Sequence, residues 1–123
     1  MQINKEPVEI HSIRSYSEHE VTINSQVYHS NLIVCRDSII TDWQAASLQT
    51  LDLDLMKPVL ETSPEVIIIG HTQSGVLVPL EILMALSQQR IGLEAMSLGA
   101  ACRTFNILLS EGRNVTLGII FSP

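Results

Sequence analysis

The feature that most constrains the fold is an uninterrupted apolar run, Val-Ile-Ile-Ile at positions 66–69, followed at once by Gly70. A run of β-branched residues with no polar side chain leaves neither face suited to water. It therefore predicts a strand that is covered on both sides, as in the centre of a parallel or mixed sheet. Gly70 is expected to end this strand.

Two helices and two further strands are expected after this run. Pro79 presets the backbone for a first helical position, and Glu81 then lies in the first turn, where a carboxylate is favourable. The face of that helix predicted to be buried consists of Leu80, Ile82, Leu83, Met84 and Leu86. A strand is expected next over 93–96, and the last strand over 115–121. Between them we expect a helix from Gly99 to about Ser110, capped by Gly112. The buried stripe of this helix is predicted to be Ala101, Phe105, Leu108 and Leu109.

The first half is expected to be rich in β-structure. Short runs over 20–24, 27–35 and 38–43 carry β-branched residues and are separated by turn chemistry, which predicts an antiparallel meander or a pair of hairpins. A short helix is expected over 55–61, capped by Asp54, with Pro58 in its first turn. The prediction is therefore one α/β domain over 1–123: a mixed central sheet with a βαβαβ C-terminal half and an antiparallel, β-rich N-terminal part.

Charge and composition exclude several classes of partner. The 123 residues carry a formal charge of −6, and the seven basic side chains are scattered, so nothing resembles the basic stripe of a nucleic-acid-binding protein. Anionic membranes are disfavoured for the same reason. The longest uncharged stretch, 66–80, is too short and too polar to span a bilayer. Only 16% of residues are charged, which favours a protein partner or a homo-oligomer that covers part of the surface.

The cysteines and the N-terminus bear on the cellular compartment. Cys35 and Cys102 form neither a disulfide framework nor a CxxC metal pair. Reduced, buried thiols in a reducing compartment are the simpler interpretation. The first residues lack the apolar segment of a secretory signal, so a cytoplasmic, soluble protein is expected.

A ligand site in such a sheet is expected beyond the carboxyl ends of the strands. There, two glycine-containing loops, 70–75 and 97–99, open toward helix N-termini, which attract anions. Arg103 could hold a carboxylate or phosphate, and Cys102 lies where a helix dipole would lower the pKa of its thiol. The candidate ligand-binding residues are Gly70, His71, Thr72, Gln73, Gly99, Cys102, Arg103 and Asn106.

No complete catalytic signature accompanies these residues. The 70–75 loop lacks the Lys-Ser/Thr pair of a P-loop, and Ser74 does not lie in a nucleophile elbow. A nucleophile–base pair of Cys102 and His71 is one alternative, and a structural role for Arg103 at a loop or partner surface is another. His11, His19 and His29 show no metal-ligand spacing, and neither a metal nor another cofactor is expected.

The motif Ala-Ala-Cys-Arg-Thr-Phe-Asn at 100–106, followed by Glu-Gly-Arg at 111–113, resembles a small family of domains of unknown function. That family includes mitochondrial respiratory complex I assembly factor 3 and the adipogenesis-associated Mth-domain protein. Further matching positions are Pro64, Glu65, Gly70, Pro79, Gly92 and Glu94. The resemblance implies a compact α/β fold with a mixed sheet. It implies no reaction, because the members with known roles act through protein partners.

Two departures from the family pattern bear on the site. Relatives commonly have Gly-Thr-Gly after the first strand of this half, where this chain has Gly70-His71-Thr72. Relatives often have Asp-Thr before the Gly-Ala-Ala helix, where Ser97-Leu98 stand here. Two hypotheses follow. The first is a non-catalytic protein-binding, assembly or regulatory factor. The alternative is a binder of, or an enzyme acting on, a small anionic metabolite at the carboxyl edge of the sheet.

Overall fold

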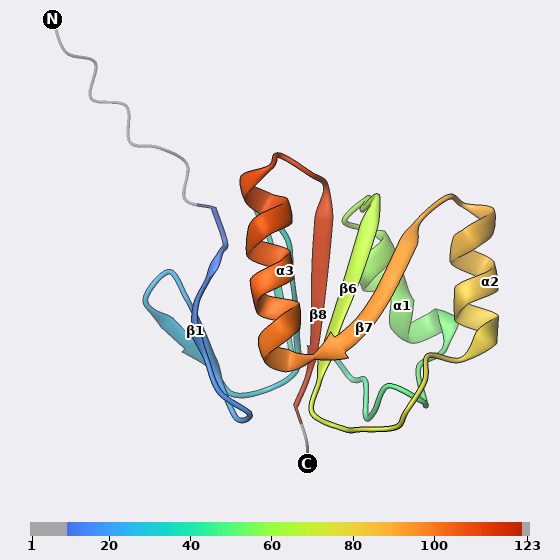
Figure 1. Cartoon of the computed structure of the whole chain (residues 1–123), viewed down its shortest axis with the longest axis horizontal. Helices are drawn as coiled ribbons and strands as arrows, with labels where there is room; N and C mark the ends of the chain where they lie inside the picture. The colour runs from blue at the N-terminus through green and yellow to red at the C-terminus, as the bar shows by residue number, and fades with distance from the viewer. Residues whose placement is uncertain (1–9, 122–123) are drawn as a thin grey trace, which may run out of the picture.

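The computed structural model describes residues 10–121, which form two sheets and three helices (Figure 1). The elements in chain order are β1 (Ile13–Tyr16), β2 (Val21–Ile23), β3 (Gln26–Tyr28), β4 (Leu32–Val34), β5 (Ile39–Thr41), α1 (Leu53–Leu60), β6 (Val66–His71), α2 (Leu80–Gln88), β7 (Gly92–Ser97), α3 (Leu98–Ser110) and β8 (Val115–Ile120). The predicted α/β class, with its βαβαβ second half, is confirmed.

The N-terminal strands divide between the two sheets. Strands β1, β2 and β3 form an antiparallel sheet of their own, whose β2–β3 turn places Asn24 and Ser25 at positive φ (49° and 73°). Both central residues of a two-residue hairpin turn of this kind need such angles, and Asn adopts them readily. Strands β4 and β5 instead join the larger sheet. The antiparallel pairing was predicted, whereas the division was not.

The larger sheet has five strands in the order β5-β4-β8-β6-β7. Strands β6, β7 and β8 run parallel, and β4 pairs antiparallel with β8, so the sheet is mixed. Strand β6 lies between two neighbours and is buried on both faces, as its apolar run predicts. It extends to His71, one residue beyond the glycine that was expected to end it. Strand β7 forms one edge of the sheet.

The helices cover the two faces of this sheet separately. Helix α3 packs on one face, where Phe105 meets Ile68 and Leu117 in one apolar cluster. Helices α1 and α2 contribute to a second cluster on the opposite face, which contains Ile67 and Ile69. Figure 1 shows α3 in front of the sheet, with α1 behind it and α2 beside β7.

The predicted cap of helix α1 and the predicted place of Pro58 in it were both wrong. Helix α1 begins at Leu53, and its cap is Asp52 rather than Asp54: the Asp52 carboxylate accepts a hydrogen bond from the Leu55 N–H at 2.8 Å. Pro58 therefore lies inside the helix, beyond its first turn. A proline there has no N–H to donate to the preceding turn. The burial of Met56 and Val59 stabilises the helix despite this loss.

The predicted buried face of α2 was also wrong in part. Ile82 and Leu86 are buried, but Leu80, Leu83 and Met84 are 69%, 38% and 55% exposed. Helix α2 lies at the β7 edge, where the sheet covers only a narrow stripe of the helix. The apolar face of α2 is thus wider than the surface of the sheet that covers it.

Candidate functional site

A pocket of about 380 Å³ lies at the carboxyl ends of β6 and β7. Its walls come from three segments: residues 71–74 at the end of β6 and after it, residues 97–99 where β7 leads into α3, and residues 16–18 at the end of β1 and after it. The first two segments meet because β6 and β7 are parallel neighbours, with His71 paired to Ser97. This is the edge at which a ligand site was expected. The third wall comes from the small sheet.

His71 is the most buried polar side chain of this pocket, at 8% exposure. Its Nδ1 accepts a hydrogen bond from the Gln73 N–H at 3.2 Å. Burial lowers the pKa of His71 below its usual 6.5. A neutral ring whose Nδ1 is an acceptor carries its proton on Nε2. His71 therefore offers one N–H donor at the wall of the pocket.

The N-terminus of α3 forms a second wall. Ser97 precedes the helix, but its side chain makes no capping hydrogen bond. The first N–H groups of an α-helix lack intrahelical acceptors, so this end of α3 carries a partial positive charge. Gly99 lets Tyr16 approach this turn: a Cβ added at Gly99 would lie 2.9 Å from Tyr16 Cε1.

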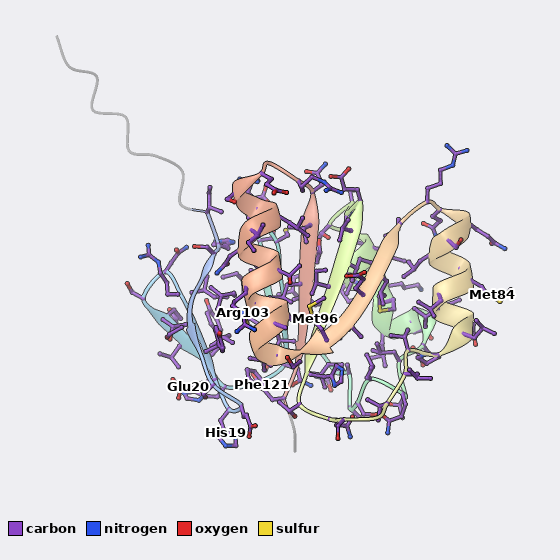
Figure 2. The ribbon with its side chains drawn as sticks, in the orientation of Figure 1. His19, Glu20, Met84, Met96, Arg103 and Phe121 are labelled. Atoms are coloured by element: carbon purple, nitrogen blue, oxygen red, sulfur yellow. The ribbon has the colours of Figure 1, made fainter. Side chains whose placement is uncertain are left out.

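Arg103 lies at the rim of the pocket rather than in its wall. Its Nη1 donates to the Tyr16 hydroxyl at 2.6 Å, which joins α3 to β1. Figure 2 shows Arg103 on the side of α3 that faces β1. The interpretation of Arg103 as a structural tie therefore describes its observed contact. Because Tyr16 does line the pocket, this contact also places a fixed positive charge next to the site.

Asn106 and Cys102 lie away from the pocket. The Asn106 side chain is hydrogen-bonded to the backbone of Ile13. Cys102 is fully buried in the apolar cluster beneath α3. It lies beyond the first turn of the helix, and burial raises the pKa of its thiol to about 12, although the Arg103 charge acts in the opposite direction. The expectation of a lowered thiol pKa was wrong, and a nucleophile–base pair with His71 loses its basis.

The candidate residues thus separate into two groups. His71, Thr72, Gln73 and Gly99 line the pocket, while Gly70, Cys102, Arg103 and Asn106 do not. Gly70 has a packing role: a Cβ there would lie 2.8 Å from the Ala101 Cβ, so its absence lets α3 approach β6. Sequence reasoning missed Tyr16, Ser17 and Glu18, which only the packing of the small sheet brings to the site.

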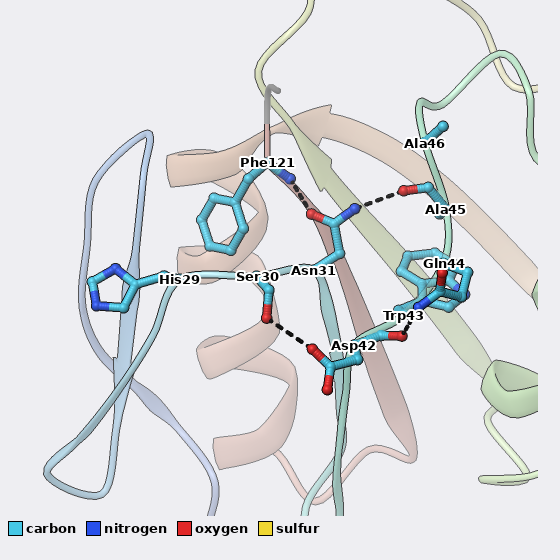
Figure 3. A pocket seen from close by; sticks show the side chains of 9 residues that line it. All are labelled: His29, Ser30, Asn31, Asp42, Trp43, Gln44, Ala45, Ala46 and Phe121. Atoms are coloured by element: carbon cyan, nitrogen blue, oxygen red, sulfur yellow. Dashed lines mark hydrogen bonds between the residues drawn. The ribbon is translucent and has the colours of Figure 1, made fainter.

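A second cavity, of about 440 Å³, lies near the end of β8 and is lined by Asn31, Trp43 and Phe121, among others (Figure 3). Its polar groups are largely engaged within the chain. Asn31 Nδ2 donates to the Ala45 carbonyl at 2.6 Å, and Asn31 Oδ1 accepts from the Phe121 N–H at 2.8 Å. We interpret Asn31 as a structural clamp between three segments.

The third feature is an exposed apolar surface, which we name the α2 surface. It consists of Val76, Leu77, Val78, Leu80, Leu83, Met84, Leu93 and Ala95. All but Met84 line a groove of about 420 Å³ between α2, the segment before it and β7. Leu77 is 82% exposed. Figure 2 shows Met84 on the side of α2 that faces away from the sheet.

Two matched motifs of the sequence meet in the loops at the other end of the sheet. Arg113 Nε donates to Glu65 Oε1 at 2.8 Å, and the Asn114 N–H donates to the same oxygen at 3.2 Å. These bonds lower the pKa of Glu65 below its usual 4.5. Gly112 ends α3 at a φ of +76°, a left-handed angle that glycine adopts without strain. The Pro-Glu and Glu-Gly-Arg motifs therefore join the starts of β6 and β8.

Comparison with known proteins gives relatives over most of the chain. A protein of Francisella tularensis subsp. holarctica named "13 kDa major membrane protein" is 31% identical over 113 residues, which are 87% of this chain and 88% of the relative. An NMR structure of a Xanthomonas campestris protein is 33% identical, with a TM-score of 0.80 and coverage of 98% of this chain and 92% of that one.

A third relative shares the fold at lower identity. The solution structure of a Bordetella pertussis protein, described as a Mth938-like domain, is 21% identical, with a TM-score of 0.69 and coverage of 98% and 92%. Within residues 10–121 we find no helix with the length and apolar character needed to cross a bilayer.

The family model described as "Protein of unknown function (DUF498/DUF598)" matches residues 13–120, nearly the whole described chain. This match and the Mth938-like fold agree with the resemblance carried by the 100–106 and 111–113 motifs. The chain belongs to the DUF498/DUF598 family of proteins of unknown function.

Proposed function

We propose that this chain is a non-catalytic protein-binding factor, of an assembly or regulatory kind, and that it binds its partner through the α2 surface. The observation that carries the proposal is the exposure of Leu77, Leu80 and Met84, at 82%, 69% and 55%. Contiguous exposed apolar side chains rimmed by polar ones are typical of interaction sites.

The shape of the α2 surface favours a protein partner. The groove between α2 and β7 has room for apolar side chains of a partner segment. Strand β7 is also an edge strand, so the backbone groups on its outer side are unpaired by the sheet. A partner that inserts apolar side chains there could pair with this edge as well.

The charge of the chain favours a basic partner over a lipid surface. The whole protein carries −6, and the exposed carboxylate of Glu81 lies in the first turn of α2. An anionic bilayer would be repelled, whereas a partner with apolar residues flanked by Lys or Arg would be complementary. We keep the expectation of a cytoplasmic location as part of this proposal.

A site-specific photocrosslinking experiment tests the proposal. A photoreactive phenylalanine analogue at Leu80 is expected to crosslink to a distinct polypeptide in cells of the source organism. The same analogue at Ile107, a 57% exposed residue on α3, is the matched control and is expected to give no such product. With the purified partner, Leu80→Glu is expected to weaken binding at least roughly ten-fold, as loss of an interface hot spot does. Ile107→Glu should leave the affinity unchanged.

Three results would contradict the proposal. One is a purified partner that binds Leu80→Glu as tightly as the wild type. Another is a crosslink at position 80 only to a second copy of this chain, which would make the α2 surface a self-association site. The third is Leu80-dependent flotation with lipid vesicles without a protein product, which would assign the surface to membrane binding, a role suggested by the name of the Francisella relative.

A further inference from the structure

The pocket at the carboxyl ends of β6 and β7 carries an inference that is separate from the α2 surface, because the two share no residue. We propose that this pocket binds the carboxylate of a small organic acid that also carries a hydroxyl or ammonium group. The carboxylate lies between His71 Nε2 and the first turn of α3, and the donor group of the ligand faces Glu18.

His71 supplies the observation that points to a ligand. The side chain is 92% buried, yet its Nε2 makes no hydrogen bond within residues 10–121. Every side-chain nitrogen or oxygen in that range that is fully enclosed has a hydrogen-bond partner. Because Nε2 has none, it is not fully enclosed, and it retains access to the pocket that His71 lines. A buried ring held by Gln73 at Nδ1 is therefore left with one fixed donor at a cavity wall.

The first turn of α3 supplies the second set of donors. Ser97, which precedes this turn, is paired with His71 in the sheet, and its side chain does not cap the helix. Ser97, Leu98 and Gly99 line the pocket at this turn, and the Tyr16 ring packs against Gly99 where a side chain would otherwise stand. Helix N-termini of this kind stabilise negative charge.

The opposite wall determines the class of ligand. The Tyr16 hydroxyl accepts from Arg103 and so keeps its own proton for a ligand oxygen. Glu18, in contrast, adds a carboxylate to the lining, which repels a bare anion. A small acid that carries a hydroxyl or ammonium donor as well as its carboxylate matches both walls. A volume of about 380 Å³ is at the small end of metabolite pockets.

The inference is tested by NMR titration with three acids that share a three-carbon chain: propionate, L-lactate and L-alanine. Lactate or alanine is expected to cause saturable shifts of the Gln73 and Gly99 amides, with at least three-fold tighter binding than propionate. His71→Asn keeps an acceptor where Nδ1 stands and removes Nε2, and it is expected to weaken binding at least ten-fold. Ser110→Ala, at the far end of α3, is the control and should bind like the wild type.

The outcomes separate this inference from the proposed function. Leu80→Glu should retain full binding of the acid, because its surface is separate. The inference is overturned if none of the three acids gives saturable shifts up to 50 mM, if His71→Asn binds unchanged, or if propionate or inorganic phosphate binds as tightly as lactate and alanine. The last result would indicate a general anion site without selection by Glu18.

Discussion

The side-chain amide of Asn106 is hydrogen-bonded to both backbone polar groups of Ile13. Its Oδ1 accepts from the Ile13 N–H at 2.8 Å, and its Nδ2 donates to the Ile13 carbonyl at 2.9 Å. Ile13 begins β1, an edge strand of the small sheet, so one side chain of α3 provides hydrogen-bond partners for the backbone of this edge. The same sheet supplies Tyr16 and Glu18 to the pocket. Asn106 therefore acts on the site by holding its third wall in place.

Replacement of Asn106 by Ala is expected to destabilise the protein by about 1–3 kcal/mol, because it leaves two part-buried backbone groups of Ile13 without partners. Urea unfolding followed by circular dichroism measures this loss. Ser110→Ala removes an exposed hydroxyl of the same helix and should change stability by less than about 0.5 kcal/mol. Equal effects of the two variants would show that the Asn106 contacts do not stabilise the fold.

Gly70→Ala is expected to cost about 1–3 kcal/mol, since the added methyl group would lie 2.8 Å from the Ala101 Cβ and push α3 away from β6. Gly92→Ala is the matched control: nothing lies within 4 Å of a Cβ at that position, and its stability should change little. In a double-mutant cycle, Ala101→Gly should relieve part of the cost at position 70. Additive effects would argue against a direct steric conflict.

Cys102 is expected to resist alkylation in the folded protein. At a thiol pKa of about 12, the reactive thiolate is scarce at pH 8, and the side chain has no exposed surface. In a Cys35→Ser background, iodoacetamide followed by mass spectrometry should label Cys102 only when denaturant unfolds the chain. Labelling of the native protein at the rate of the unfolded chain would contradict the buried, protonated thiol.

His71 is expected to titrate below 6.5, because burial disfavours its charged form. The unfolded chain then binds a proton before the folded protein does as the pH falls. The free energy of unfolding is therefore not reduced by His71 above pH 6.5, and it decreases as the pH falls from 6.5 toward the lower pKa of the folded state. The C2 proton of His71 in NMR spectra reports its pKa directly. If the free energy of unfolding of His71→Asn depends on pH as that of the wild type does, the dependence comes from other groups.

Much of the second half was predictable because its signals are local. The apolar run at 66–69 cannot be placed at a surface, and β6 is indeed central. The predicted stripe of Ala101, Phe105, Leu108 and Leu109 repeats at helical spacing, and all of it is buried on α3 except Leu108, which is partly buried. Gly112 follows this helix in the left-handed conformation that its position suggested. Each of these depends on neighbours in sequence, so the sequence by itself determined them.

The candidate site was predictable only in location. The parallel strands bring residues 71–73 and Gly99 to one edge, as the β-α-β pattern indicates. The direction of each side chain around the helix was not predictable: Arg103 contacts Tyr16, and Asn106 contacts Ile13, two partners from the start of the chain. No periodicity encodes such pairs, because they depend on how the small sheet packs against α3.

The exposed leucines of α2 show the same limit. By composition the helix has a broad apolar face, and its spacing predicts burial of Leu80, Leu83 and Met84. The sequence determined that these residues are apolar and lie on a helix. Only the tertiary structure decided that they remain exposed, because the strand order places β7 at an edge and, within residues 10–121, no further strand extends the sheet beneath them.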